Sequence, residues 1–245
     1  MSVPALFPLI MLSALVAGVA LSQRRQARLA LTTAQRWAVG LGAFCGGMLG
    51  SKLPFALADT RGAFCVQAWI SDGKTILFGL AGGYIGVEVA KALTDVRTKT
   101  GDAFAVPVAV SIGIGRLGCF VGRCCYGVPT VLPWGIDFGD GIRRHPTQLY
   151  EIAFHFALAL ALIAIERCGW FPRQRFKLYL LAYCGFRLLT EFLRPEVPIA
   201  FGLTGYQWAS LAFVPIIALL WWQDRTPATA FEHDVALPMT TADRQ

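Results

Sequence analysis

Charged residues are scarce in this chain. Only 15% of its 245 residues are Asp, Glu, Lys or Arg, whereas 56% are hydrophobic. A soluble globular domain carries about 25% charged residues, so this composition excludes an ordinary soluble protein and indicates a chain that crosses a membrane several times. The net charge of +7 does not point to nucleic acid, because the basic residues of membrane proteins concentrate in cytoplasmic loops. We expect a membrane as partner, and no nucleic acid.

The chain also lacks the charge pattern of a cleaved signal peptide. Such a peptide needs basic residues before its apolar stretch, but here Arg24, Arg25 and Arg28 come after it. Residues 4–22 are uncharged, and about 20 apolar residues are long enough to cross the hydrocarbon core. We therefore predict a retained first helix whose N-terminus lies outside the cytoplasm.

No disulfide framework is visible among the cysteines. There are seven of them, an odd number scattered over apolar segments and loops, whereas a framework needs an even, regularly spaced set. Free cysteine behaves as a small hydrophobic residue. We therefore expect Cys45 and Cys184 to be buried in the packing of the helices.

Three cysteines, Cys119, Cys124 and Cys125, lie close together in the sequence. Zinc sites usually combine two pairs of ligands, and no second pair follows here, so we expect no metal and no cofactor. A disulfide is the alternative, because the loop would face an oxidising compartment, where Cys65 lies in another loop. The sequence does not decide the redox state of these thiols.

Seven apolar segments organise the chain. They predict an all-α, polytopic integral membrane protein with about seven transmembrane helices, an outer N-terminus and a cytoplasmic C-terminus. We expect one transmembrane domain over residues 1–222 and a polar, disordered cytoplasmic tail over 223–245. Glycines dot the second and third segments, which favours close helix contacts in lipid. The segments cover residues 4–22, 37–57, 75–94, 103–121, 148–166, 178–193 and 205–222.

Basic residues set the expected orientation, although they occur on both sides of the membrane. With the N-terminus outside, the connections around residues 24–36, 91–99 and 167–177 are cytoplasmic and basic, as the positive-inside rule requires. The opposite side still carries too many basic residues for a strict pattern, which suggests that its arginines bind something anionic. These outer residues are Arg61, Lys74, Arg116, Arg123, Arg143, Arg144, Arg187 and Arg194.

The stretch from Gly113 to Glu151 is the most informative part of the sequence. It places Arg116 at the end of an apolar segment, where an arginine costs about 2.5 to 3.5 kcal/mol to insert and so marks a functional site. The stretch ends in a cluster of polar residues that leads into the next apolar segment and includes Arg144, His145 and Gln148. Capping of that helix is the structural alternative for this group.

A second group lies in the sixth apolar segment. Tyr183, Arg187, Glu191 and Arg194 are spaced by four, four and three residues, which places them on one helix face. An Arg187–Glu191 ion pair that locks helix packing is one explanation. A site for an anionic head group is the other, because the arginine fork meets phosphate oxygens in pairs and never deprotonates.

Two blocks of residues carry a resemblance to a known family. The first contains Gly115-Arg116-Leu117-Gly118, Phe120, Gly127, Pro133-Trp134-Gly135, Phe138 and Arg144-His145-Pro146-Thr147-Gln148-Leu149-Tyr150-Glu151. The second contains Tyr183, Arg187, Glu191, Phe192 and Arg194. Over roughly residues 40–196 this pattern resembles the prolipoprotein diacylglyceryl transferases, whose seven-helix topology with an outer N-terminus agrees with the orientation above.

The resemblance implies a bacterial enzyme of the cytoplasmic (inner) membrane. Its donor would be phosphatidylglycerol or another anionic phospholipid, and its acceptor the lipobox cysteine of a lipoprotein precursor, with glycerol phosphate released. Arg116 and Arg187 resemble the family's essential arginines, and we assign both to the lipid phosphate. Glu191, Glu151 and His145 complete our set of candidate catalytic residues, as possible bases. The implied substrate-binding residues are Arg116, Cys119, Gly127, Arg144, Gln148, Tyr183, Arg187 and Arg194.

The chain departs from the family pattern at three positions. Cys119 stands where the family has Asn, Cys124 where it has Glu, and Ala81 where it has a histidine to which a catalytic role is often assigned. A base would then come from His145, Glu151 or Glu191. These departures leave two alternatives open: the same lipid donor with a different acceptor through a cysteine, or a non-catalytic lipid-binding membrane protein.

Overall fold

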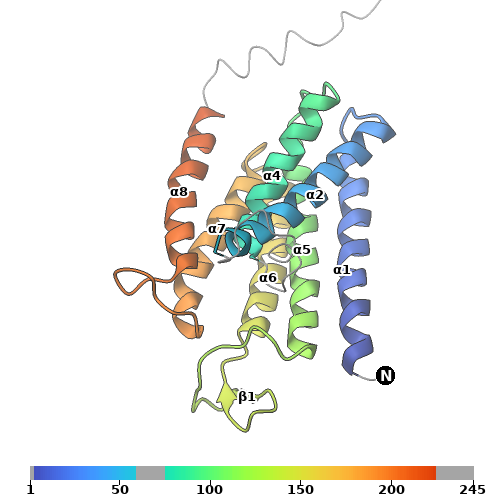
Figure 1. The fold of residues 1–245 in the computed structure, drawn as a ribbon. Coiled ribbons are helices and arrows are strands. Elements are labelled where there is room, and N and C mark those ends of the chain that lie inside the picture. The colour runs from blue at the N-terminus through green and yellow to red at the C-terminus, as the bar shows by residue number, and fades with distance from the viewer. Residues whose placement is uncertain (1–2, 59–74, 225–245) are drawn as a thin grey trace, which may run out of the picture.

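The protein is mostly helical over residues 3–58 and 75–224, which the computed structural model describes (Figure 1). The predicted tail from residue 225 and Cys65 lie outside these residues. One short hairpin interrupts the helices. The elements are α1 (Val3–Gln26), α2 (Thr33–Ala58), α4 (Ile76–Leu93), α5 (Gly101–Val121), β1 (Ile136–Asp137), β2 (Arg143–Arg144), α6 (Thr147–Arg167), α7 (Arg175–Thr190), the 3-10 helix η1 (Glu191–Leu193) and α8 (Gly205–Gln223).

A helix covers each of the seven predicted segments. Five of these helices, α1, α4, α5, α6 and α8, are long and apolar enough to cross a membrane. The other two, α2 and α7, do not meet that standard, and α7 has only 16 residues. The helical fold class is therefore confirmed, while seven full crossings remain a prediction.

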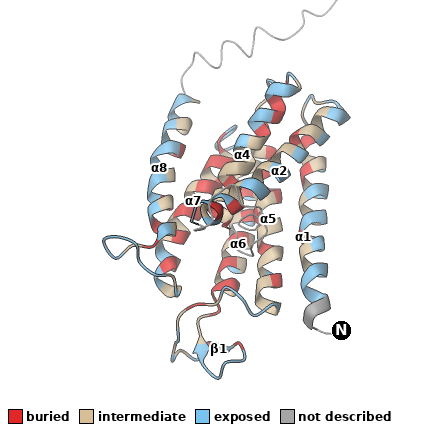
Figure 2. Cartoon of the chain, viewed as in Figure 1, coloured by how far each residue is buried: buried red, intermediate tan, exposed pale blue. Residues whose placement is uncertain are grey.

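The outer surface of the helices is apolar, as a lipid-facing surface must be. Large hydrophobic side chains such as Leu41, Ile85 and Leu160 are exposed there, and the exposed faces of α1 and α8 are plain in Figure 2. The core lies between α4, α5, α6 and α7 and contains Cys184, as predicted. The predicted burial of Cys45 is wrong, because this residue is exposed on α2, whose glycine face packs against α4 instead.

Glycines bring α2 and α4 into backbone contact. Gly42 and Gly46 of α2 lie against the backbone of Gly82 and Gly86 in α4, so closely that a Cβ atom on any of them would overlap the opposing chain. Small residues at four-residue spacing allow this approach in lipid, where dispersion contacts must replace the hydrophobic effect. The close packing predicted from the glycine pattern is confirmed.

The basic connections meet at one end of the bundle, opposite the hairpin (Figure 1). Arg25 after α1 pairs with Glu166 at the end of α6, with 2.6 Å between nitrogen and oxygen. Lys99, before α5, pairs with Asp224 after α8 at 2.6 Å. The segments that the sequence assigned to one side of the membrane therefore lie together, although their orientation toward the cytoplasm stays a prediction.

We expect Gly46→Ala to destabilise the protein. The new methyl group would meet the α4 backbone, and overpacking of this kind costs about 1–3 kcal/mol. Gly185→Ala in α7 is the matched control, since nothing lies within 4 Å of its Cβ position and alanine favours a helix. Thermal unfolding in detergent measures both variants; equal melting temperatures for the two would contradict the packing described here.

Candidate functional site

The loop between α5 and α6 is tied to the end of α7. Its hairpin pairs Ile136 with Arg144, and the N–H of Val128 donates to the carbonyl of Leu193 at 2.9 Å. Parts of the chain that are about 65 residues apart are thus joined at the hairpin end of the bundle (Figure 1). The ends of α5 and α7 and the start of α6 converge there.

Gly127 makes this junction possible. A Cβ atom at this position would lie 2.8 Å from Cβ of His145 and 2.9 Å from Cγ2 of Thr147, and it would overlap the carbonyl of Leu193. Contacts below 3.0 Å are sterically forbidden, so only glycine fits. The contacts of Gly127 are with the protein itself, which gives it a packing role where the sequence predicted substrate binding.

A buried network of four charges lies beneath the loop. Glu151 of α6 is its centre: one oxygen pairs with Nε of Arg116 from α5, and the other lies 3.0 Å from Nη1 of Arg187 from α7. Nη2 of Arg187 also pairs with Glu191. Glu151, Arg187 and Glu191 are each at most 2% exposed. The predicted residues from the two separate blocks therefore form one ion-paired chain.

Two residues that the sequence analysis did not single out support this network. The hydroxyl of Thr204 donates to Glu191 at 3.1 Å, and the guanidinium of Arg187 lies 4.4 Å from the ring centre of Tyr206. Thr204 is the N-cap of α8 in a capping box with Gln207, a motif visible in the sequence. Its contact with Glu191 follows only from the tertiary structure.

Aromatic residues extend the network into the core. Tyr183 is fully buried and stacks on His155, with 5.3 Å between ring centres. His155 also contacts Tyr179, with its Nδ1 3.2 Å from the hydroxyl of that residue. The hydroxyl of Tyr183 and Nε2 of His155 have no hydrogen-bond partner among residues 3–58 and 75–224. Buried polar atoms without partners are costly, so these atoms mark where water or a ligand can bind.

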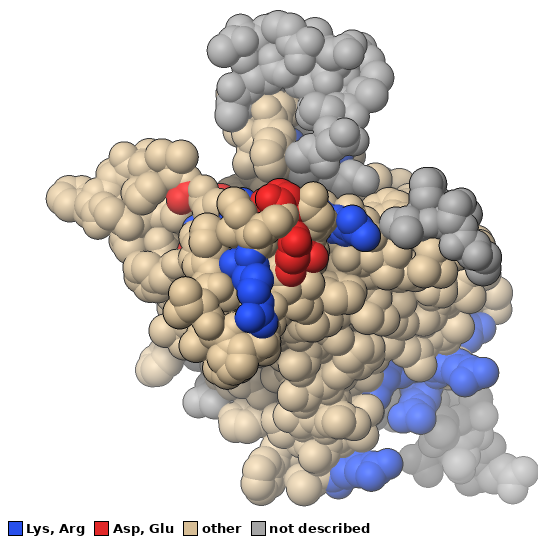
Figure 3. Space-filling model, turned by 90° about the horizontal axis from the view of Figure 1, so that it is seen from below, with Lys and Arg blue, Asp and Glu red and all other residues tan. Residues whose placement is uncertain are grey.

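Two predicted site residues belong to the hairpin and not to the ion network. His145 has its Nδ1 3.1 Å from the hydroxyl of Tyr150, and Arg144 binds Asp140 through two hydrogen bonds of 2.9 and 2.7 Å. The hydrogen bond from Arg144 lowers the pKa of Asp140. Near the centre of this view, basic and acidic side chains lie side by side, and further basic side chains lie towards its lower right (Figure 3).

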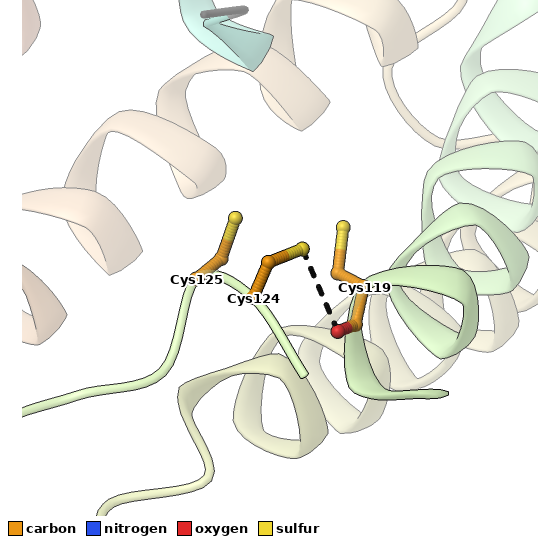
Figure 4. A group of neighbouring side chains, drawn as sticks. All are labelled: Cys119, Cys124 and Cys125. Atoms are coloured by element: carbon orange, nitrogen blue, oxygen red, sulfur yellow. Dashed lines mark hydrogen bonds between the residues drawn. The ribbon is translucent and has the colours of Figure 1, made fainter. Parts of the chain in front are cut away.

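Three thiols gather at the end of α5 and in the loop that follows it (Figure 4). The sulfur atoms of Cys119, Cys124 and Cys125 all lie within 4.8 Å of one another, and Nη1 of Arg116 is 3.8 Å from Sγ of Cys119. All three are free thiols in this structure. The hydrogen bonds from Cys119 and Cys124 hold the pKa of Cys125 far below its usual range, and the charges of Arg116 and Arg194 act in the same direction.

Polar side chains at the start of α6 hold this loop in place. The amide nitrogen of Gln148 donates to the carbonyl of Cys124 at 2.6 Å, and the hydroxyl of Thr147 donates to that of Cys125 at 2.7 Å. Arg194 pairs with Glu196 at 2.7 Å and donates to the same Cys125 carbonyl at 3.3 Å. Thr147 and Gln148 therefore anchor the cysteine loop, whereas helix capping was the structural alternative.

An apolar groove of about 630 Å³ lies between α1, α2 and α5. Leu15, Trp37 and Phe44 are among the residues that line it, and all three are exposed on the outer surface. Gly115, directly before Arg116, also lines the groove. The groove thus opens on the lipid-facing surface and extends along α5 as far as the residue that precedes Arg116.

Known proteins match most of this chain. The sequence model of the family described as prolipoprotein diacylglyceryl transferase matches residues 5–223. A phosphatidylglycerol–prolipoprotein diacylglyceryl transferase of Clostridium tetani is 36% identical over 62% of this chain and 65% of its own length. The enzyme of that name from Bordetella parapertussis is 34% identical over 54% and 56%, and the one from Coxiella burnetii is 33% identical over 76% and 75%. The chain spans between about half and three quarters of these relatives.

We expect Glu151→Gln to lower stability strongly. The change leaves Arg116 and Arg187 buried with one carboxylate between them, and breaking a buried ion pair costs about 3–5 kcal/mol. Asp140→Asn is the control, because it removes an exposed carboxylate that also pairs with an arginine. Thermal unfolding should show a large loss for Glu151→Gln and little change for Asp140→Asn; similar losses would contradict the central place of Glu151.

Proposed function

The chain belongs to the prolipoprotein diacylglyceryl transferase family, and from this premise we propose that it transfers a diacylglyceryl group from phosphatidylglycerol to the cysteine thiol of a lipoprotein precursor. The thiol sulfur forms a bond to the glyceryl carbon, the bond from that carbon to the phosphate oxygen breaks, and glycerol phosphate leaves with the thiol proton. The observation that carries the proposal is the buried Arg116–Glu151–Arg187 network, together with an apolar groove that is lined by Gly115, the residue before Arg116.

Arg116 contacts the phosphate of the donor lipid. Its side chain is 12% exposed, Glu151 engages its Nε and Cys119 accepts from Nη1, which leaves Nη2 and the second N–H of Nη1 for phosphate oxygens. The acyl chains lie in the groove, whose lining residue Gly115 adjoins Arg116. Charge that develops on the leaving phosphate is then stabilised by a guanidinium already held in place.

Arg187 acts as a positioning residue. It is 1% exposed and binds two carboxylates, Glu151 and Glu191, so few of its donors can reach a ligand. It holds Glu151, which in turn orients Arg116. Glu191, anchored by Thr204, and Tyr183 complete this support. The resemblance treats Arg116 and Arg187 alike, but in this proposal Arg116 binds the phosphate and Arg187 positions Glu151.

The acceptor side of the site lies at the hairpin. Arg144 and His145 border it there, and Gln148 holds the cysteine loop. His145 is engaged with Tyr150, and both carboxylates of the ion network are bound to arginines. Glu151 and Cys119 are the proton-binding side chains that contact Arg116 among the described residues.

In the membrane, we place the hairpin outside and the end of α8 in the cytoplasm of a bacterial cell, with the protein in the inner membrane. The N-terminus and the end of α8 lie at opposite ends of the bundle (Figure 1), which suits an odd number of crossings. Residues 1–222 form the membrane domain in this arrangement, with 223–245 as a cytoplasmic tail. The basic connections gather at the end away from the hairpin, which agrees with the positive-inside rule.

A different acceptor is the second candidate, favoured by one observation. The sulfur of Cys119 lies 3.8 Å from Arg116, where a thiol of the protein itself could receive the lipid group from the same donor. Mass spectrometry of the intact protein after incubation with phosphatidylglycerol would then show one added diacylglyceryl group, which Cys119→Ser removes.

We expect the purified protein to add a diacylglyceryl group to a lipobox peptide in the presence of phosphatidylglycerol. Arg116→Lys should lower the rate by about 10²-fold or more, because lysine keeps the charge but loses the paired donors. Arg28→Lys is the control, since this side chain is 76% exposed at the far end of the bundle. Mass spectrometry of the peptide measures the product.

Two outcomes would overturn this assignment. Absence of any peptide adduct, while an enzyme with the family's usual histidine modifies the same peptide in parallel, would reject the transferase reaction. Equal rates for Arg116→Lys and Arg28→Lys, at equal protein levels, would reject Arg116 as the phosphate ligand.

A further inference from the structure

The three clustered thiols have the geometry of a metal site. In tetrahedral zinc sites the Zn–S distance is about 2.3 Å, so bound sulfurs lie about 3.8 Å apart. The sulfur atoms of Cys119, Cys124 and Cys125 already lie within 4.8 Å of one another, so no pair exceeds that spacing by more than about 1 Å. Cys124 and Cys125 are exposed and Cys119 is half-buried, so an ion can enter from solvent.

The backbone holds these thiols together at a cost. Arg123 and Cys125 have φ values of 51° and 62°, in the left-handed region that residues with a side chain rarely occupy. Gln148 and Thr147 donate hydrogen bonds to the backbone carbonyls of Cys124 and Cys125, as described above. Strained backbone that is held by several contacts is typical of functional sites. The loop is therefore a built support for the three sulfur atoms.

The surrounding charges suit a metal bound by thiolates. Three thiolates and one Zn²⁺ carry a net charge of −1. Nη1 of Arg116 lies 3.8 Å from Sγ of Cys119, and Nη1 of Arg194 bonds the carbonyl of Cys125. Two guanidinium groups therefore flank the cluster, and they stabilise the excess negative charge.

We propose that Cys119, Cys124 and Cys125 bind one Zn²⁺ ion as three thiolates, and that its fourth coordination position takes the acceptor thiol. Three protein ligands with one open position are the arrangement of catalytic zinc sites, and soft thiolate ligands select zinc over magnesium or calcium. The proposal that the three cysteines bind Zn²⁺ rests on the geometry of the cluster. The second part rests on the proposed transferase function.

Ala81 stands where the family has a histidine, and an alanine side chain cannot take a proton from the acceptor thiol. The metal site supplies this activation of the thiol instead. A thiol that binds the ion gives its proton to water and displaces a water ligand, so a metal-bound thiolate forms. The thiolate is the nucleophilic form of sulfur. It then forms a bond to the glyceryl carbon of the donor, the bond from that carbon to the phosphate oxygen breaks, and glycerol phosphate leaves as an anion from its place at Arg116. Activation of the acceptor thus requires no histidine.

The metal site is tested by metal content. The wild-type protein, purified with a non-thiol reductant and dialysed after addition of Zn²⁺, should contain one zinc per chain. Cys119→Ser, Cys124→Ser and Cys125→Ser should each lower this content at least tenfold. Cys168→Ser is the matched control, because Cys168 is an exposed free thiol outside the cluster, and it should keep the metal.

A second measurement needs no variant. Co²⁺ in place of Zn²⁺ should give the intense thiolate-to-cobalt absorption of a tetrahedral site. Wild-type protein without bound metal and without this band would overturn the proposal. So would a disulfide among the three cysteines in protein purified without reductant, or equal loss of metal from Cys168→Ser.

The fourth position is tested on the cobalt protein without any lipid donor. A lipobox peptide should change the cobalt spectrum at one peptide per chain, whereas the same peptide with serine in place of its cysteine should not. An unchanged spectrum would overturn acceptor binding to the metal. Because no turnover is needed, this result is separate from the activity assay: a changed spectrum with no lipid transfer would reject the transferase function and leave the metal site in place.

Discussion

The charge of Glu151 is the constraint on which the rest of the site depends. A carboxylate that is 2% exposed must be neutralised where it lies, and the two arginines that do this come from α5 and α7. The Glu151 side chain therefore fixes the relative positions of α5, α6 and α7. The position of Arg116, and with it the proposed place of the phosphate, follows from this buried pairing.

Parts of this arrangement could be predicted from the sequence. Arg116 stood out because an arginine is expensive in an apolar segment, and the four-residue spacing of Tyr183, Arg187 and Glu191 predicted one face. The glycine repeats predicted the contact between α2 and α4, which the structure confirms. In each case the signal is local: a periodic pattern or a residue that is costly in its surroundings.

The remainder depends on contacts between distant segments. Glu151 was a candidate base, but no pattern showed that it bridges two arginines, and the partner of Glu191 in α8, Thr204, lies beyond an irregular loop. The three thiols did not match the spacing of paired zinc ligands. Their convergence requires a left-handed turn at Cys125, which cannot be read from a sequence in which no glycine marks it.

The apolar groove between α1, α2 and α5 is open on the outer surface of the bundle. A lipid that enters through such an opening arrives by diffusion within the plane of the bilayer and never has to leave it. A peptide that has gained two acyl chains can depart through the same gap, since its new hydrocarbon tails partition directly into the surrounding lipid. Entry of the donor and escape of the product would then share one opening to the lipid.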